Sequence, residues 1–270
     1  MVVSFGNLEE LITLVNNVHG FDLSGYSRAS LKRRVSRILT IYQIDFAGLK
    51  DSLVNSPGFF NEFLVEVTVN VTEMFRDPAF YKTLREEIHP YLATFPHIKV
   101  WSAGCATGEE VYSLAILLSK EGLYSRTFIY GTDVNTAVLE RAKQGIIDLK
   151  KMKVYSDNYL QTDSGDSLSE YYTAMYDSAI VHHELRKNIL FSTHNLVSDG
   201  VFNEFQLITC RNVLIYFTAD LQHKVVNLLY ASLALFGFLC LGARETLPAN
   251  GLRHKFRVIS KTHNIYQKIA

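Results

Sequence analysis

Residues 100–112 read VWSAGCATGEEVY, an apolar strand followed by a glycine-containing turn and then by helix-compatible residues. The strand passes through Trp101, the turn contains Gly104 and Gly108, and a helix would begin at Glu109. A strand, a tight turn and a helix N-terminus in this order can present backbone N–H groups to a nucleotide-like ligand. The stretch therefore predicts the first strand–turn–helix unit of a nucleotide-binding sheet.

A second apolar stretch, Thr127–Thr132 (TFIYGT), ends at Asp133. A carboxylate at the tip of the second strand can accept hydrogen bonds from both hydroxyls of a ribose. The glycine turn alone is weak evidence for any ligand. Together with Asp133 it favours an adenosine-containing cofactor.

The residues around the turn favour a cofactor that carries no phosphate. The G-x-G-x-x-G pattern of pyrophosphate-binding turns is absent, and Glu109 and Glu110 would repel a pyrophosphate. S-adenosyl-L-methionine carries an ammonium and a sulfonium, so that an acid near the turn would be a favourable partner. Alternatively, both glutamates favour the helix dipole at its first turn, an interpretation that is stronger for Glu109 than for Glu110.

Composition limits the class of protein. The chain has 270 residues, of which 48% are apolar, so a small domain and a larger one with a sizeable core are expected. Its 27 basic and 27 acidic side chains give no overall field that would favour nucleic acid or a membrane surface. Cys105, Cys210 and Cys240 form no metal-ligand spacing. Their spacing therefore predicts no metal site. An odd number of cysteines, with no signal peptide or membrane-spanning run, predicts a cytoplasmic protein.

The chain divides into a helical domain, residues 1–75, and a second domain, residues 76–270. In the first domain apolar residues recur at helical spacing, as they do between Leu8 and Val15. A basic helix is expected between Arg28 and Arg37, and its cationic residues include Arg28, Arg33, Arg34 and Arg37. Such a run is often only a solvated face. The sharper hypothesis is a docking surface for an acidic protein partner, because the run has too few aromatics for nucleic acid.

From residue 98 onward, strand and helix candidates alternate, which predicts an α/β fold with a doubly wound parallel sheet. The strand candidates are Ile98–Ser102, Phe128–Thr132, Ile189–Ser192 and Phe205–Thr209. The helix candidates are Glu109–Lys120, Thr136–Gln144 and Ala219–Phe236. Three short strands at 238–241, 256–259 and 264–268 predict an antiparallel C-terminal edge. Residues 150–185 are poorly patterned and are expected to form a mixed, partly exposed insertion.

Four further segments occur with the glycine turn: VNVTEMFRDP at 69–78, GTDVNTAVL at 131–139, FSTHNL at 191–196 and TCRNVLIYF at 209–217. Together these five motifs resemble the CheR-type family, the bacterial methyltransferases that methylate glutamates on chemotaxis receptors. The resemblance covers nearly the whole chain. It implies a small N-terminal helical domain followed by a Rossmann-like methyltransferase domain that converts S-adenosyl-L-methionine to S-adenosyl-L-homocysteine.

The resemblance also implies a set of site residues. Together with the turn residue Gly104, the cofactor contacts would be Asn70, Thr72, Arg76, Glu110, Asp133, Asn195, Leu196, Arg211 and Asn212. Asn70 and Thr72 would contact the methionine part, Glu110 would lie near its amino group, and Asp133 would bind the ribose. Asn195 and Leu196 would flank the adenine. Arg76 and Tyr216 would be the catalytic residues, with Tyr216 beside the reactive methyl group.

The chemistry is compatible with these roles. A glutamate acceptor has a pKa of about 4.3 and is already ionised at neutral pH, so the enzyme needs to orient it and not to deprotonate it. Arg76 can hold a carboxylate through two N–H groups, and Tyr216 offers a hydroxyl and an aromatic wall. Simpler interpretations remain. Asn70 and Thr72 could cap the helix that follows them, and Asp133 could cap the helix near Asn135.

Two departures from the family pattern bear on the acceptor. Ala243-Arg244-Glu245 replaces a histidine and a Ser-Glu pair near one wall of the active site, and residues 150–188 show no clean sign of the antiparallel subdomain that grips a receptor tail in some members. Acceptor specificity and tethered recruitment are therefore less defined than cofactor binding.

Two classes of function compete. The first is a protein-glutamate O-methyltransferase acting on the cytoplasmic domain of a methyl-accepting chemoreceptor or a related signalling protein. The second is a non-catalytic S-adenosylmethionine-binding sensor or scaffold. The presence of both Arg76 and Tyr216 favours the enzyme, since a pure binder needs neither. A nicotinamide-dependent oxidoreductase is disfavoured by the missing phosphate-binding glycines.

Overall fold

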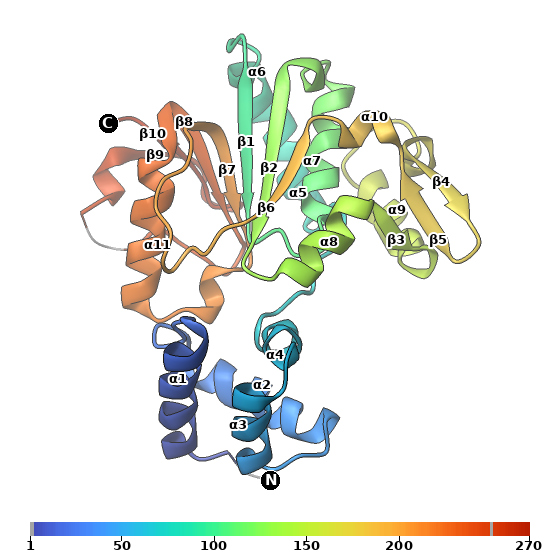
Figure 1. Cartoon of the computed structure of the whole chain (residues 1–270). Helices are drawn as coiled ribbons and strands as arrows, with labels where there is room; N and C mark the ends of the chain where they lie inside the picture. The colour runs from blue at the N-terminus through green and yellow to red at the C-terminus, as the bar shows by residue number, and fades with distance from the viewer. Residues whose placement is uncertain (1–2, 249–250) are drawn as a thin grey trace.

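The N-terminal part of the molecule is a bundle of helices that lies beneath a larger sheet domain (Figure 1). The structure is a computed structural model and describes residues 3–248 and 251–270. The bundle contains α1 (Phe5–His19), α2 (Arg28–Ile41), α3 (Phe46–Asn55) and α4 (Phe59–Val67). Each helix buries an apolar stripe against the others, as the helical spacing between Leu8 and Val15 predicts.

The larger domain is built on one sheet with the strand order β6-β2-β1-β7-β8-β10-β9. Its strands are β1 (Ile98–Ala103), β2 (Thr127–Asp133), β6 (Ile189–Thr193), β7 (Phe205–Cys210), β8 (Leu233–Leu241), β9 (Phe256–Ser260) and β10 (Ile265–Lys268). The first five in spatial order are parallel. β10 runs antiparallel to both β8 and β9 and so forms the antiparallel C-terminal edge.

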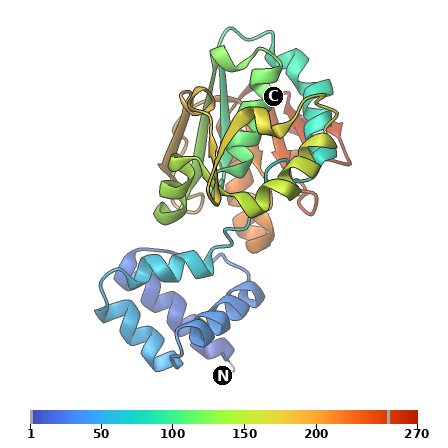
Figure 2. The same cartoon turned by 90° about the vertical axis from the view of Figure 1, so that its right-hand side faces the viewer.

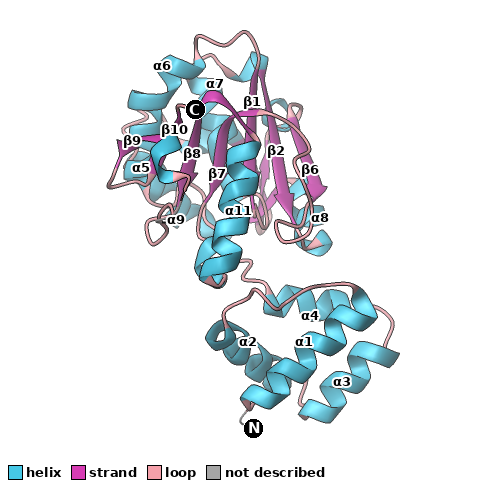
Figure 3. Ribbon diagram, turned by 90° about the vertical axis from the view of Figure 1, so that its left-hand side faces the viewer, coloured by secondary structure: helices cyan, strands magenta, loops and turns pink. Residues whose placement is uncertain are grey.

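Helices cover both faces of this sheet, which makes the domain an α/β sandwich of the Rossmann type. Figure 3 shows α11 (Ala219–Ala231) on one face, and Figure 2 shows the other face with α7 (Glu109–Lys120). The further helices are α5 (Pro78–Thr83), α6 (His89–Leu92), α8 (Thr136–Gln144), α9 (Leu149–Leu160) and α10 (His183–Arg186). A π-helical turn spans Leu84–Ile88, and 3₁₀ turns span Tyr124–Arg126, Leu168–Tyr171, Leu214–Tyr216 and Arg253–Lys255.

The helix predicted over Ala219–Phe236 is too long. It ends at Ala231, and Leu233–Leu241 forms β8, which pairs in parallel with β7. The continuous apolar run from residue 228 onward hid this change, because periodicity cannot separate a buried helix end from a buried strand. The predicted strand at 238–241 therefore belongs to the parallel part of the sheet.

Residues 146–181 contain the second difference from prediction. They form a separate three-stranded antiparallel sheet in the order β3-β5-β4, made of β3 (Ile146–Asp148), β4 (Tyr172–Met175) and β5 (Ser178–Val181). The sequence shows no clean sign of such a subdomain, and the structure contains one. Strands of three or four residues are too short to show an alternating pattern, and Tyr176, which takes a positive φ of 51°, is not the glycine that marks most tight turns.

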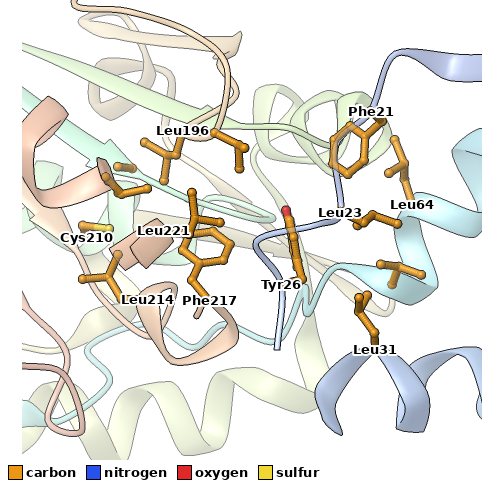
Figure 4. Packing of buried hydrophobic residues seen from close by; sticks show 14 of the residues in the cluster. Phe21, Leu23, Tyr26, Leu31, Leu64, Leu196, Cys210, Leu214, Phe217 and Leu221 are labelled. Carbon is orange, nitrogen blue, oxygen red and sulfur yellow. The ribbon is translucent and has the colours of Figure 1, made fainter. Parts of the chain in front are cut away.

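One apolar core runs across the boundary between the two domains. Figure 4 shows Leu23, Leu31 and Leu64 of the helical domain on one side of the Tyr26 ring and Phe217 and Leu221 of the sheet domain on the other, and all six residues are buried in one cluster. The two domains therefore form a continuous structure at this point. Within residues 3–248 and 251–270, no helix is both long and apolar enough to cross a bilayer.

Candidate cofactor and acceptor site

A cavity of about 1080 Å³, counting the space at its open mouth, lies where the carboxyl ends of β1, β2 and β7 meet the helical domain. The carboxyl edge of a parallel sheet is the usual ligand site of this architecture. Every residue that the sequence assigned to the cofactor or to the reacting centre lines this cavity: Asn70, Thr72, Arg76, Gly104, Glu110, Asp133, Asn195, Leu196, Arg211, Asn212 and Tyr216. Residues from five separate segments are thus brought together.

The glycine turn after β1 is held by hydrogen bonds to the end of β2. Gly104 N and Cys105 N donate to the carbonyl of Thr132 at 2.8 and 2.9 Å, and Ala106 N donates to the carboxylate of Asp133 at 3.0 Å. Gly104 has a φ of +75°, and a Cβ there would lie 2.5 Å from the Val213 side chain, so only glycine fits. These N–H groups are committed inside the protein, which agrees with a ligand that has no phosphate.

Asp133 lies at the tip of β2 with 9% of its surface exposed. Its Oδ2 accepts from Ala106 N and its Oδ1 from Asn135 N, both at 3.0 Å. Burial raises the pKa of this carboxyl, and the backbone N–H groups partly offset the rise. Each oxygen keeps a further lone pair for a ligand hydroxyl. The capping alternative does not hold, because Asn135 is the N-cap of α8 and Asp133 accepts from the backbone N–H of Asn135 before the helix begins.

Glu110 is fixed between two strands. Its Oε1 accepts from Ser102 Oγ of β1 at 2.9 Å and from Thr209 Oγ1 of β7 at 2.6 Å. Its Oε2 accepts from Arg211 Nη1 at 3.2 Å. The carboxylate is therefore held in place without using all of its acceptor capacity, and it faces the cavity.

Glu109, the preceding residue, has a different environment. It is 3% exposed, does not line the cavity, and accepts from Thr107 Oγ1 at 2.6 Å. Burial raises the pKa of its carboxyl. Of the two glutamates, only Glu110 is placed to meet a ligand, in agreement with the sequence interpretation.

Arg211 organises the cavity wall at the end of β7. Its side chain is 3% exposed and lies 4.0 Å from the centre of the Phe80 ring. Its Nη2 donates to Asp77 Oδ2 at 2.7 Å and to the carbonyl of Arg76 at 3.2 Å, while its Nη1 reaches Glu110. A single buried guanidinium therefore ties the segment that carries Arg76 to the end of β7.

Arg76 and Tyr216 are both half-buried at the cavity wall. Across the part of the chain that the structure describes, neither side chain makes a hydrogen bond or an ion pair. The residues on either side of Arg76, Phe75 and Asp77, take positive φ values of 51° and 57°. Strained backbone of this kind persists where the surroundings fix it, often at functional sites.

The remaining predicted contacts have structural roles as well. Asn70 Nδ2 donates to the carbonyl of Val65 at 2.9 Å, so Asn70 caps the end of the preceding helix α4 and not the start of the following one. Asn195 Oδ1 accepts from Val197 N at 2.9 Å, and Leu196 is 8% exposed. Cys105 and Cys210 are buried, and burial raises the pKa of both thiols well above the ordinary value, so neither is suited to act as a nucleophile.

Sequence reasoning missed Glu245. This residue is 4% exposed, and its carboxylate accepts from Asn212 N at 2.8 Å, Gly242 N at 2.6 Å and Ile215 N at 3.3 Å. It holds Asn212, which has a φ of +61°, and the turn that leads to Tyr216. The sequence analysis interpreted Ala243-Arg244-Glu245 only as a departure from the family's histidine and Ser-Glu pair. A lone acid after a buried apolar strand and a glycine was the signal that pointed to Glu245.

The four docking candidates on α2 lie outside the cavity. Arg28 Nε pairs with Glu9 at 2.6 Å, and Arg37 Nε pairs with Glu66 at 3.2 Å. Arg33 is exposed and Arg34 half-buried, and among the described residues neither forms an ion pair. Of the four candidates, Arg33 and Arg34 therefore have no acid partner among the described residues.

The donors and acceptors of the cavity suit S-adenosyl-L-methionine. Two anchored carboxylates, Glu110 and Asp133, face the space and retain lone pairs for an ammonium and for ribose hydroxyls. The buried guanidinium of Arg211 is already neutralised by Asp77 and Glu110, so it creates no demand for a phosphate. With the sheet order described above, the site defines an S-adenosylmethionine-dependent methyltransferase domain of Rossmann type.

Comparison with known families identifies the chain more closely. Residues 70–265 match the family described as CheR methyltransferase, SAM binding domain, and residues 6–68 match CheR methyltransferase, all-alpha domain. The chain therefore belongs to the CheR methyltransferase family, and S-adenosyl-L-methionine is its cofactor.

Three relatives extend this result. A Pseudomonas putida protein named "Putative methyltransferase Cher3" is 44% identical over 96% of this chain and 95% of its own length. The proteins named chemotaxis protein methyltransferase of Listeria monocytogenes and chemotaxis protein methyltransferase 1 of Vibrio cholerae are 32% and 31% identical. They cover 84% and 75% of this chain, and 85% and 74% of their own lengths are matched.

Proposed function

We propose that the protein is a protein-glutamate O-methyltransferase whose acceptor is the cytoplasmic domain of a methyl-accepting chemoreceptor or a related signalling protein. The observation that supports this most is the position of Arg76 and Tyr216. Both line the same cavity as the anchored carboxylates, and within the described residues both lack partners. A buried or half-buried cation without an acid partner is a natural receptor for an incoming carboxylate. Relatives named chemotaxis protein methyltransferase are consistent with this acceptor.

The roles of the cofactor residues belong to the same proposal. Glu110 accepts hydrogen bonds from the ammonium of the methionine part, with Asn70 and Thr72 beside it. Asp133 accepts from the ribose hydroxyls, while Asn195 and Leu196 flank the adenine. Gly104 lets the turn after β1 pass close to the ligand. Arg211 and Asn212 complete the wall between the methionine part and the acceptor.

The bound cofactor supplies an electrophilic methyl group on a sulfonium. The protein supplies orientation: Arg76 holds the acceptor carboxylate through its N–H groups, and the Tyr216 ring and hydroxyl limit how that carboxylate can approach. The carboxylate is ionised at neutral pH, so the protein needs no general base. The helical domain closes one side of the cavity and excludes water from the reacting atoms.

A single-turnover assay tests this function. The protein is mixed with S-adenosyl-L-methionine labelled in the methyl group and with the cytoplasmic fragment of a chemoreceptor from the same cell. We expect label in the fragment that is released by mild base, as a methyl ester is. Cofactor binding without transfer to any fragment would instead support the non-catalytic sensor or scaffold.

Recruitment of the acceptor is assigned to α2. We propose that Arg33 and Arg34, with Arg28 and Arg37 at the ends, contact an acidic face of the acceptor. Replacing Arg33, Arg34 and Arg37 with glutamate should raise the KM for the acceptor strongly and leave S-adenosyl-L-homocysteine affinity unchanged. Lys143→Glu, on the exposed face of α8, is a control charge reversal outside the proposed docking surface. Unchanged turnover in the triple variant would rule out α2 as the docking surface.

The same proposal divides the chain at residue 75 into the helical domain 1–75 and the methyltransferase domain 76–270, and it locates the protein in the cytoplasm. Three buried free cysteines fit a reducing compartment. Limited proteolysis with and without S-adenosyl-L-homocysteine tests the division. Cleavage should fall in the extended segment between α4 and α5 and should slow when ligand is present, because residues 69–73 line the cavity.

A further inference from the structure

Residues 25–27 of the helical domain pair with residues 216–218 of the methyltransferase domain. Ser27 N donates to the carbonyl of Tyr216 at 2.8 Å, and Thr218 N donates to the carbonyl of Gly25 at 2.8 Å. Between them, Tyr26 and Phe217 form an isolated antiparallel bridge. The backbone of the helical domain is thus hydrogen-bonded directly to the segment that carries Tyr216.

The contact leaves no room for a side chain at residue 25 unless Leu221 shifts. A Cβ on Gly25 would lie 2.6 Å from Cδ2 of Leu221 on α11. Tyr26 follows in the chain and is held by the bridge, and its ring meets the Phe217 ring edge-on at 5.1 Å. Figure 4 shows the Tyr26 ring between Phe217 and Leu23. Its position is therefore fixed by both domains.

Tyr26 lines the cofactor cavity although it belongs to the helical domain. Only 8% of its surface is exposed, and its hydroxyl makes no hydrogen bond to any residue that the structure describes. Tyr26 and Asp133 both line the cavity. Burial raises the pKa of the Tyr26 phenol, and the Asp133 and Asp22 carboxylates raise it further. The hydroxyl oxygen keeps accessible surface at the cavity wall, so it is free to form a hydrogen bond with a bound ligand.

We propose that Tyr26 is a cofactor-binding residue supplied by the helical domain, whose hydroxyl hydrogen-bonds the nucleoside half of S-adenosyl-L-methionine beside Asp133. The inference rests on the assignment of Asp133 to the ribose. Ser30 and Leu31 line the same wall, so the helical domain provides a face of the pocket and not only a docking surface. Neither domain alone contains the complete binding site.

Isothermal titration with S-adenosyl-L-homocysteine tests Tyr26→Phe against Tyr42→Phe. Tyr42 is in the same domain, packs edge-on against Phe59, and does not line the cavity. Loss of one neutral hydrogen bond should weaken binding about five- to tenfold in Tyr26→Phe and leave it unchanged in Tyr42→Phe. The ligand-free Tyr26→Phe protein should melt no lower than wild type, because the hydroxyl has no partner to lose. Wild-type affinity in Tyr26→Phe overturns the inference, and so does a lowered melting temperature with unchanged affinity.

A second probe locates the contact on the ligand. 5′-Methylthioadenosine carries the nucleoside half without the amino acid half, and Tyr26→Phe should weaken its binding by the same factor. A loss seen only with S-adenosyl-L-homocysteine would place the hydroxyl at the other end and contradict the proposal. Asp133→Ala tests the ribose assignment separately from the Tyr26 contact. If this variant binds S-adenosyl-L-homocysteine as wild type does, the ribose assignment fails, whatever Tyr26→Phe shows.

Discussion

The two sides of the cavity are prepared in different ways. On the cofactor side, the carboxylates of Glu110 and Asp133 each accept hydrogen bonds from fixed protein donors. On the acceptor side, Arg76 and Tyr216 make no side-chain hydrogen bond to the described residues. The cofactor side is therefore organised before any ligand arrives, while the polar groups of the acceptor side can still take up a substrate.

This difference has an energetic meaning. Anchored acids lose little rotamer freedom when a ligand binds, which favours affinity for the cofactor. Unpaired groups give up no internal partner when they meet an acceptor carboxylate, which favours turnover. The comparison predicts that changes on the cofactor side act on binding and changes on the acceptor side act on rate.

Glu110→Gln should have the largest effect. It removes a charge that faces the ligand and leaves the buried Arg211 with Asp77 as its remaining acid partner. We expect S-adenosyl-L-homocysteine to bind about 10- to 100-fold more weakly, since a hydrogen bond to a charged group is worth about 1.5–3 kcal/mol. Isothermal titration measures the affinity, and urea unfolding measures the accompanying loss of stability. Wild-type affinity would break the comparison on its cofactor side.

The pH dependence of binding examines Asp133. Burial raises its pKa above 3.8, so S-adenosyl-L-homocysteine affinity should begin to fall at a higher pH than an exposed aspartate would give, by up to about tenfold per pH unit. Asp133→Asn should lose this dependence. The free energy of unfolding should change with pH in the opposite direction. Because the pKa of Asp133 is raised in the folded state, its contribution to stability is complete below pH 3.8 and is lost as pH rises through the folded pKa. Titrations across pH 4–7 and urea unfolding separate the two.

Tyr216→Phe should act on rate. Without its hydroxyl the acceptor carboxylate is oriented less well, and kcat should fall about five- to tenfold, as expected for one hydrogen bond. S-adenosyl-L-homocysteine affinity should stay within about twofold of wild type. A variant that binds cofactor poorly while keeping its kcat would assign Tyr216 to the wrong side of the cavity.

Glu109→Gln should have the smallest effect and sharpens the contrast with Glu110. Because burial raises the pKa of Glu109, its ionised form disfavours the fold at neutral pH, and the neutral glutamine should raise the free energy of unfolding by less than about 1 kcal/mol. The gain should disappear as pH falls below the raised pKa toward 4.5. Cofactor affinity should not change. A large loss of affinity would show that both glutamates contact the ligand.

The main sheet and the cavity could be predicted from the sequence because their signals are local. Most of the first strand, its glycine turn and the start of α7 lie within thirteen consecutive residues, 100–112, and Asp133 ends the next strand. Motifs that follow strand ends converge at one edge of a parallel sheet, so their order in the chain was enough to bring them together.

Other features depend on contacts that no local pattern reveals. The antiparallel sheet β3-β5-β4 has strands too short for periodicity, and the end of α11 is hidden in a continuous apolar run. Glu245 acts on Asn212 through a fold that first brings β8 beside β7. Tyr26 reaches the cavity only because the helical domain packs where it does.

The pairing between residues 25–27 and 216–218 restricts how relatives of this protein can be recombined. A chimera that takes its helical domain from one parent and its methyltransferase domain from another would bring together two contact surfaces from different proteins. Grafts designed to redirect the enzyme to new receptors should therefore transplant both tripeptides and the Gly25–Leu221 contact as a single block.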